Sequence, residues 1–70
     1  MTPAQQFGAN LAHAREARGL SQSQLARKVD VVDTYISRIE TGRAQPSFQL
    51  ILTLASQLGI PPGQLFSGVE

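Results

Sequence analysis

The sequence has no cysteine and only one histidine, His13. Without cysteine, the chain has neither a disulfide framework nor a thiolate metal site. A single imidazole also provides no Cys–His catalytic pair and too few ligands for zinc. No glycine-rich phosphate loop occurs either. We therefore expect no metal, no cofactor and no enzymatic activity.

Long hydrophobic runs are absent as well. The longest apolar stretches, such as residues 50–52, are far shorter than the roughly 20 residues that a membrane span needs. No charged start with a cleavable apolar region follows Met1. We expect residues 1–70 to form one cytoplasmic domain with no membrane partner and, at this length, no small-molecule effector.

The net charge is low, at +1. This charge is weaker than the basic balance that nucleic-acid-binding proteins usually have. The total does not decide the question, because acids and bases can lie on different faces of the molecule. If Arg15 and Glu40 neutralise each other, Arg38 and Arg43 stay free for an anionic partner.

What the sequence does contain is a series of helical patterns with clear ends. Gly19, Gly42 and Gly59 are each placed to end a helix. Residues 2–5 and 21–24 both match the capping box that opens a helix, in which a Ser or Thr is followed three positions later by Gln. These signals predict the bounds of the first two helices.

The rest of the chain completes the expected fold. A third helix is expected over about residues 33–41, and a fourth begins after Pro46 with Ser47 as its N-cap. Because the proline pair 61–62 cannot extend that helix, residues 64–66 are expected to form a short last turn. The patterns predict an all-α, five-helix bundle. The residues expected to face its core are Phe7, Leu11, Ala14, Leu25, Ala26, Val29, Ile36, Ile39, Phe48, Ile51, Leu54, Ala55 and Leu58.

Residues 22–41 fit the helix-turn-helix template, in which two short helices cross at about 100° through a turn of three or four residues. Ala26 is small where the second helix must approach closely. Val31 and Ile36 are apolar where the crossing is buried. The template therefore predicts that the second helix of the pair turns one side to the core and the other side outward.

Several linked segments carry a family resemblance: residues 15–22 (REARGLSQ), 24–26 (QLA), 35–43 (YISRIETGR), 46–47 (PS), and the run from 54–55 (LA) to 65–66 (LF). In these segments the chain resembles the helix-turn-helix regulators of the phage repressor and Cro type, the XRE family. The resemblance implies a nucleoid-associated transcription regulator, a repressor, that binds a palindromic operator on double-stranded DNA as a homodimer. It also implies that the third helix of the bundle enters the major groove.

Two positions depart from the family pattern, and both lie in or beside the turn. A glycine is usual at position 30, where the backbone tends to be left-handed. Asp30 tolerates that conformation better than most residues, at a cost of about 1 kcal/mol. A Ser or Thr N-cap is usual at position 32, but Val32 offers no acceptor, so Asp33 is a candidate cap instead.

The resemblance places four residues of the third helix near base edges. Asp33 either accepts from cytosine N4 or acts as the cap and helix-dipole partner. Thr34 meets a thymine methyl or a phosphate, and Ser37 lies one turn further along. Arg38 is the first candidate for specificity, because arginine reads guanine bidentately, with a phosphate contact as the alternative.

Four further residues are expected to contact phosphates. Gln22 begins the second helix, and the resemblance implies that it braces both the DNA backbone and the recognition helix. Tyr35 either touches the backbone or props the recognition helix. Arg43 and Ser47 are candidates for the other flank of the groove, although Arg43 could equally be a solvated loop charge.

The remaining assignments concern structure and assembly. The resemblance implies a structural ion pair between Arg15 and Glu40. The last two segments also carry apolar residues beyond those the core needs, which predicts a dimer surface. Its candidate residues are Leu50, Leu52, Leu65 and Phe66. Two alternatives stay open, namely that Leu50 and Leu52 close the far side of the core and that the last turn drops Leu65 onto it.

A second hypothesis keeps the fold and changes its use. The chain could be a protein-interaction module, such as an antitoxin or a bridging subunit, with DNA binding secondary. The low net charge and the acidic Asp33 favour this hypothesis. It predicts that no palindromic sequence is selected from random DNA.

Overall fold

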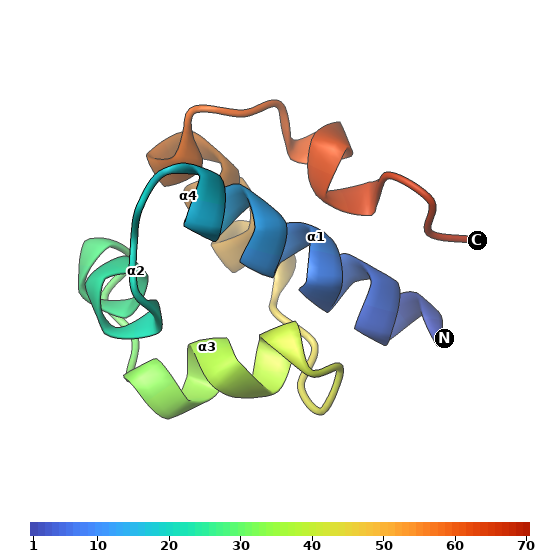
Figure 1. Cartoon of the computed structure of the whole chain (residues 1–70), viewed down its shortest axis with the longest axis horizontal. Helices are drawn as coiled ribbons and strands as arrows, with labels where there is room; N and C mark the ends of the chain where they lie inside the picture. The colour runs from blue at the N-terminus through green and yellow to red at the C-terminus, as the bar shows by residue number, and fades with distance from the viewer.

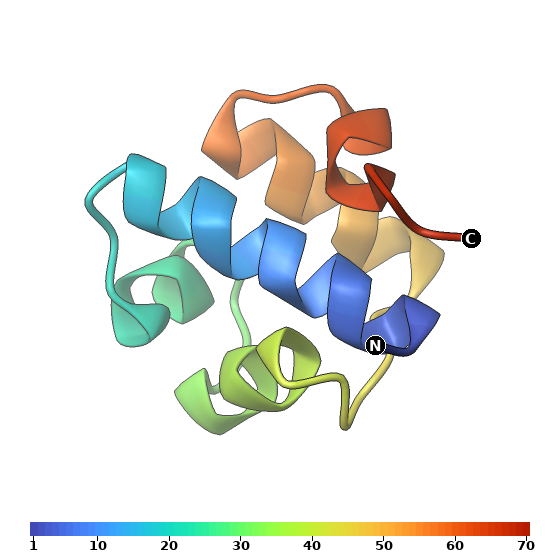
Figure 2. The same cartoon turned by 45° about the vertical axis from the view of Figure 1, so that its right-hand side comes forward.

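The computed structural model describes all residues from 1 to 70, and every regular element in it is helical. In Figure 2, α1 runs across the front of the molecule, with α2 and α3 below it and α4 and the last turn above it. The two termini lie on the same side (Figure 1). None of the helices combines the length and the apolar character needed to cross a membrane. The elements are α1 (Pro3–Ala17), α2 (Gln22–Lys28), α3 (Asp33–Glu40), α4 (Phe48–Leu58) and the 3-10 helix η1 (Pro62–Phe66).

The bundle has four α-helices rather than the expected five, because the last segment is a 3-10 turn. The Gln64 N–H donates to the Pro61 carbonyl at 3.0 Å, and the Ser67 N–H donates to the Gln64 carbonyl at 3.3 Å. Both bonds span three residues, as in a 3-10 helix. Pro61 and Pro62 have no N–H to donate, and so short a segment cannot sustain an α-helix.

The starts of the α-helices follow the sequence signals. The Thr2 hydroxyl accepts from the Gln5 N–H at 3.1 Å, and the Gln5 side chain accepts from the Thr2 N–H at 2.9 Å. Ser21 and Gln24 form the same capping box at α2, and Ser47 caps α4. These three predictions are confirmed, because a cap depends only on residues a few positions apart.

The turn between α2 and α3 has the predicted left-handed residue. Asp30 has a φ of 60° and is the only non-glycine residue with a positive φ. Ala26 is 2% exposed, and Val31 packs against the core. The short turn and the small side chain together let α2 and α3 pack closely, as the helix-turn-helix template predicts.

Most of the predicted core is buried, but Phe48 is not. It is 76% exposed, whereas Leu54, Ala55 and Leu58 of the same helix are at most 1% exposed. Phe48 is the first residue of α4, and the core reaches only the second half of that helix. Ile51, between them, is partly buried. The prediction for Phe48 was wrong because helical spacing identifies a face and not how far along the helix that face is covered.

Gly8 explains how closely α1 packs on α3. A Cβ atom at this position would lie 2.5 Å from the Glu40 carbonyl oxygen and would also collide with that of Ile39. Only a residue without a side chain allows α1 to contact the backbone at the end of α3. This contact fixes the position of α3 in the molecule.

Candidate nucleic-acid interface

The outer side of α3 is polar, and its inner side is fully buried. Ile36 and Ile39 are both 0% exposed. Thr34 and Arg38 are exposed and Ser37 is half-buried. At about 100° per residue, these three polar residues lie within one arc of roughly 100°, opposite the two isoleucines. The side chains therefore project together from one side of the helix.

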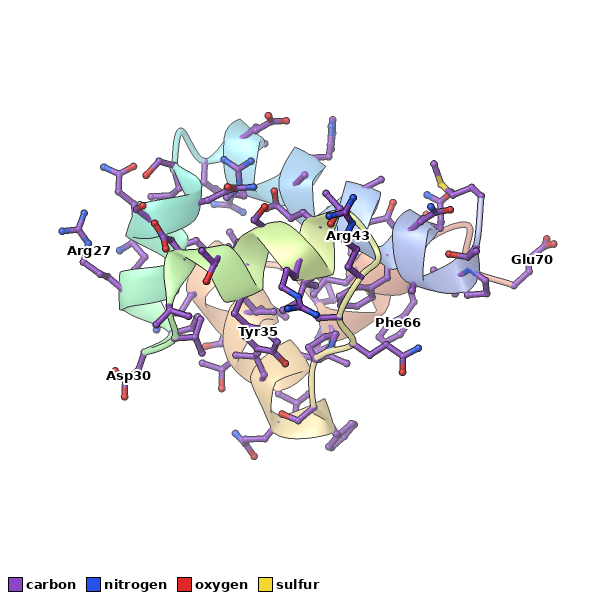
Figure 3. All side chains as sticks on the ribbon, turned by 90° about the horizontal axis from the view of Figure 1, so that it is seen from below. Arg27, Asp30, Tyr35, Arg43, Phe66 and Glu70 are labelled. Atoms are coloured by element: carbon purple, nitrogen blue, oxygen red, sulfur yellow. The ribbon has the colours of Figure 1, made fainter.

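Two arginines on this side of the molecule have no acidic partner. Both ion pairs of the protein involve Arg15, so Arg38 and Arg43 are unpaired. Arg43 follows α3, and Figure 3 shows its side chain at one end of that helix, with Arg27 and Asp30 at the other end. The positive charge near α3 is therefore available to an anionic partner.

Asp33 does not cap α3. The N-cap is Val32, which makes no side-chain hydrogen bond, and Asp33 is the first residue of the helix itself. The Asp33 carboxylate accepts instead from the Ser23 hydroxyl of α2, with 3.0 Å between Oδ2 and Oγ. The capping half of that alternative was wrong, because Val32 is the N-cap and the Asp33 carboxylate is bonded to Ser23, whereas the position of Asp33 in the first turn suits the helix dipole.

Tyr35 and Ser47 hold the segment that follows α3. The Tyr35 hydroxyl donates to the Gln45 carbonyl at 3.4 Å, so this half-buried ring supports the connection between α3 and α4. The exposed Ser47 accepts from the Leu50 N–H at 3.1 Å and starts α4. Both residues have a structural role on the flank of α3, beside Arg43.

A buried polar network joins the end of α3 to α1 and α2. Arg15 Nε donates to Glu40 Oε2 at 2.7 Å, and Nη2 donates to Oε1 at 3.2 Å. Gln22 Nε2 donates to the same Oε1 at 2.9 Å. Hydrogen bonding to Glu40 raises the pKa of the Arg15 guanidinium, against the lowering effect of burial. Gln22 therefore braces α2 against α3, and only the spatial contact identifies Glu40 as its partner.

The apolar candidates for a dimer surface divide into two groups. Leu65 is 0% exposed and belongs to the core of the single chain, so its assignment to a dimer surface was wrong. It points inward because η1 packs on α1 and α4. Leu50 packs partly against the core. Leu52 is 37% and Phe66 45% exposed, and Phe66 also packs on Phe7 with 5.0 Å between the ring centroids.

One shallow apolar hollow lies beside Phe66. It has a volume of about 210 Å³ and lies between the start of α1, the segment before α4 and the C-terminal residues. A larger and more open hollow, of about 420 Å³, lies on the side of α3 and is lined by Val32, Thr34, Tyr35, Arg38 and Ala44. No cluster of three or more metal-ligating side chains occurs in the protein. The polar arc of α3 is therefore the strongest candidate for a functional surface.

A short helix, a tight turn and a second helix with a buried side and an exposed polar side define the helix-turn-helix class of DNA-binding domains. Residues 6–65 match the family described as the helix-turn-helix domain. The chain belongs to this family, and within it to the XRE type.

Two curated relatives are 37% identical to the chain. One is the control protein C.MunI of a Mycoplasma species, matched over 65 residues that make up 91% of this chain and 88% of that protein. The other is the HTH-type transcriptional regulator DdrOP3 of Deinococcus deserti, matched over 60 residues, or 86% of this chain. The match spans only 46% of the length of the Deinococcus regulator.

Solved structures of similar proteins have the same fold. The restriction-modification controller protein C.AhdI from Aeromonas hydrophila is 39% identical, with a TM-score of 0.84 over 87% of this chain and 92% of that one. The clp gene regulator ClgR from Corynebacterium glutamicum is 25% identical, with a TM-score of 0.90 over 96% of this chain and 71% of that one. These relatives support DNA-binding regulation as the function of this fold.

Proposed function

We propose that the protein is a sequence-specific transcription regulator that binds a palindromic operator as a dimer, with α3 in the major groove. The observation that carries this proposal is the polar arc of Thr34, Ser37 and Arg38 opposite the buried Ile36 and Ile39. An α-helix fits the width of the major groove, where each base pair displays its own pattern of donors and acceptors.

Arg38 and Thr34 are the residues we assign to base recognition. The unpaired guanidinium of Arg38 donates to O6 and N7 of guanine. The methyl group of Thr34 packs on a thymine methyl, and Ser37, one turn along, contributes a hydroxyl that suits either a donor or an acceptor. Asp33, at the start of the same helix, accepts from an amino group of a base.

The residues on the flanks of α3 bind phosphates and set the orientation of the helix. Gln22 uses one of its two amide N–H groups on Glu40, which leaves the second N–H to donate to a phosphate oxygen. We assign Arg43, Tyr35 and Ser47 to the other flank, where Tyr35 donates to the Gln45 carbonyl in the segment between Arg43 and Ser47. A clamp on both flanks is the arrangement that holds a recognition helix in register with the base pairs.

The proposed dimer surface is formed by α4 and η1. Phe48 and Leu52 are four positions apart, so both lie on the same side of α4. Together with Phe66 and the exposed part of the Leu50 side chain, they form an apolar surface that water solvates poorly. A twofold pair of chains then places its two α3 helices about 34 Å apart on one side of the duplex. A dimer bound in this way blocks the DNA beneath it, and repression is the mode we propose.

Selection from a random duplex library tests the proposal. We expect one palindromic sequence to be enriched, and we expect Arg38→Ala to lose the preference at one position of each half-site by about tenfold, the value of one good base contact. Thermal unfolding verifies that the variant is folded, and Lys28→Ala, which removes an exposed charge from α2, serves as the matched control. If no palindrome is enriched, the protein-interaction hypothesis replaces this one. An unchanged ranking of operators with Arg38→Ala overturns the role of Arg38.

A further inference from the structure

The hydrogen bond between Ser23 and Asp33 links the two helices of the motif on their exposed side. Ser23 is the second residue of α2 and Asp33 is the first residue of α3. The Ser23 hydroxyl donates to Oδ2 of Asp33 at 3.0 Å. Both residues are exposed, and Asp33 takes part in no ion pair, although Arg27 lines the same surface hollow. The carboxylate is therefore held by a neutral partner, and its second oxygen makes no hydrogen bond within the protein.

The position of this carboxylate matters because α3 carries the proposed base-reading arc. Asp33 and Ser37 are four residues apart, so the carboxylate lies one turn before the hydroxyl of Ser37 on the same side of α3. In the major groove, cytosine and adenine present amino groups, whereas guanine and thymine present acceptor oxygens. A fixed carboxylate accepts from the first pair and is repelled by the second.

The same charge also opposes binding to DNA of any other sequence. Non-specific affinity comes from cations that replace counterions on the phosphates. With a net charge of only +1, one negative charge at the start of the recognition helix is a large fraction of the total. This charge lowers the affinity for all duplexes. Only at the operator does a base amino group bond to the carboxylate and restore the lost affinity.

We propose that Asp33, positioned by Ser23, determines specificity by exclusion, admitting cytosine or adenine and rejecting guanine and thymine at one position of each half-site. This inference rests on the proposed function and deepens it. Ser23 is a positioning residue, since without its hydrogen bond the carboxylate can rotate away from the base edge.

Four variants test the proposal in the full chain by selection from a random library and by titration with individual duplexes. Asp33→Asn removes the charge but keeps the shape. Asp30→Asn removes an equal charge three residues earlier, where asparagine tolerates the left-handed backbone, and is the matched control. Ser23→Ala removes the hydrogen bond, and Ser23→Thr restores the hydroxyl.

We expect Asp33→Asn to lower the preference for cytosine over guanine at one position by about tenfold, as expected for one base contact. Ser23→Ala should lower the same preference by about threefold, the effect of one hydrogen bond, and Ser23→Thr should recover it. Asp30→Asn should raise the affinity for random DNA without changing any position of the operator.

Three outcomes overturn the proposal. If Asp33→Asn and Asp30→Asn change the selected sequence equally, the carboxylate acts only through net charge. If Ser23→Ala lowers thermal stability but keeps the preference, the hydrogen bond is purely structural. If the wild-type chain binds one palindrome that has guanine or thymine wherever α3 is in contact, exclusion by Asp33 is wrong although the proposed function stands. If the wild-type chain selects no sequence at all, the proposed function itself fails.

Discussion

At the scale of single residues, Arg15 joins α1 to the last residue of α3, Glu40. Its guanidinium binds both oxygens of Glu40, and its Nη1 atom donates to the Leu20 carbonyl at 2.7 Å. The side chains of Arg15 and Glu40 are 11% and 5% exposed. An ion pair this buried gives up much of its hydration, so removing one partner leaves the charge of the other uncompensated.

Replacing Arg15 with alanine should lower the free energy of unfolding by about 3 kcal/mol, because Glu40 would stay buried with only Gln22 as a partner. Urea unfolding followed by circular dichroism measures the loss. Arg27→Ala, which removes an exposed arginine without an ion pair, should change stability by less than about 0.5 kcal/mol. Equal stability of the two variants would contradict the structural role of the pair.

The pKa of Arg15 also predicts how this contribution depends on pH. Its pKa is raised in the folded protein, mainly by the hydrogen bond to Glu40. A base with a raised pKa contributes its full stabilisation below the pKa of the unfolded chain, and this stabilisation is lost only as the pH rises through the higher pKa of the folded protein. We therefore expect the stability gap between the wild type and Arg15→Ala to stay constant through neutral and mildly alkaline pH.

At the scale of helices, the contact between α1 and α3 and the start of α3 decide how α3 is held. Gly8 allows α1 to lie against the carbonyl groups of Ile39 and Glu40. The other end of α3 is weaker, because Val32 occupies the N-cap position without making a cap bond. α3 is thus closely packed at its C-terminal end and lacks a side-chain cap at its N-terminal end.

Gly8→Ala should destabilise the protein by about 3 kcal/mol, at the upper end of overpacking effects, because backbone atoms cannot move aside as a side chain can. Gly63→Ala is the matched control, since a Cβ atom there would meet nothing within 4 Å. Thermal unfolding compares the two. A small and equal effect of both substitutions would show that α1 and α3 separate easily.

Val32→Ser should raise the free energy of unfolding by about 1 kcal/mol by supplying the missing N-cap of α3. Val32 is 67% exposed, so little apolar burial is lost in the exchange. Val32→Ala, which provides no acceptor, separates the cap effect from the loss of the valine. No gain from serine over alanine in urea unfolding would mean that water already satisfies the N–H groups.

For the whole molecule, the low net charge does not reveal the positive charge that lies near α3. The net charge is only +1, but Arg15 and Glu40 cancel within the interior. Arg38 and Arg43 stay unpaired on the side of α3, and Figure 3 shows Arg43 at one end of that helix. Phosphate binding through a few such arginines makes affinity strongly dependent on salt, and most of that dependence comes from the cations that contact phosphate.

Arg43→Ala should reduce the slope of log K against log salt concentration by about 1 per protomer, because one phosphate contact is lost. The affinity for all duplexes should fall alike, since phosphates are the same in every sequence. Arg18→Ala removes the same charge where it lies near the Gly59 carbonyl at the end of α4, and should leave the slope unchanged. Equal slopes for the wild type and Arg43→Ala would place Arg43 away from DNA.

The sequence by itself determined where the α-helices begin and end and which helical face is apolar. Capping boxes, prolines and glycines act over a few residues, so the signals at Thr2, Ser21 and Ser47 were read correctly. The left-handed backbone at Asp30 was implied by the family resemblance, in which a glycine is usual at this position, and it is confirmed. Helical spacing also separated the buried Ile36 from the exposed Arg38.

Only the tertiary structure decided which side chains meet and how far the core extends. The exposure of Phe48, the burial of Leu65 and the hydrogen bond from Ser23 to Asp33 depend on which helix lies against which. So does the need for a glycine at position 8. Local patterns depend on residues that are neighbours along the chain. How far the core covers a helix, how closely two helices approach and which polar side chains bond to each other depend on residues far apart in sequence. Packing brings such residues together only once the whole domain has formed.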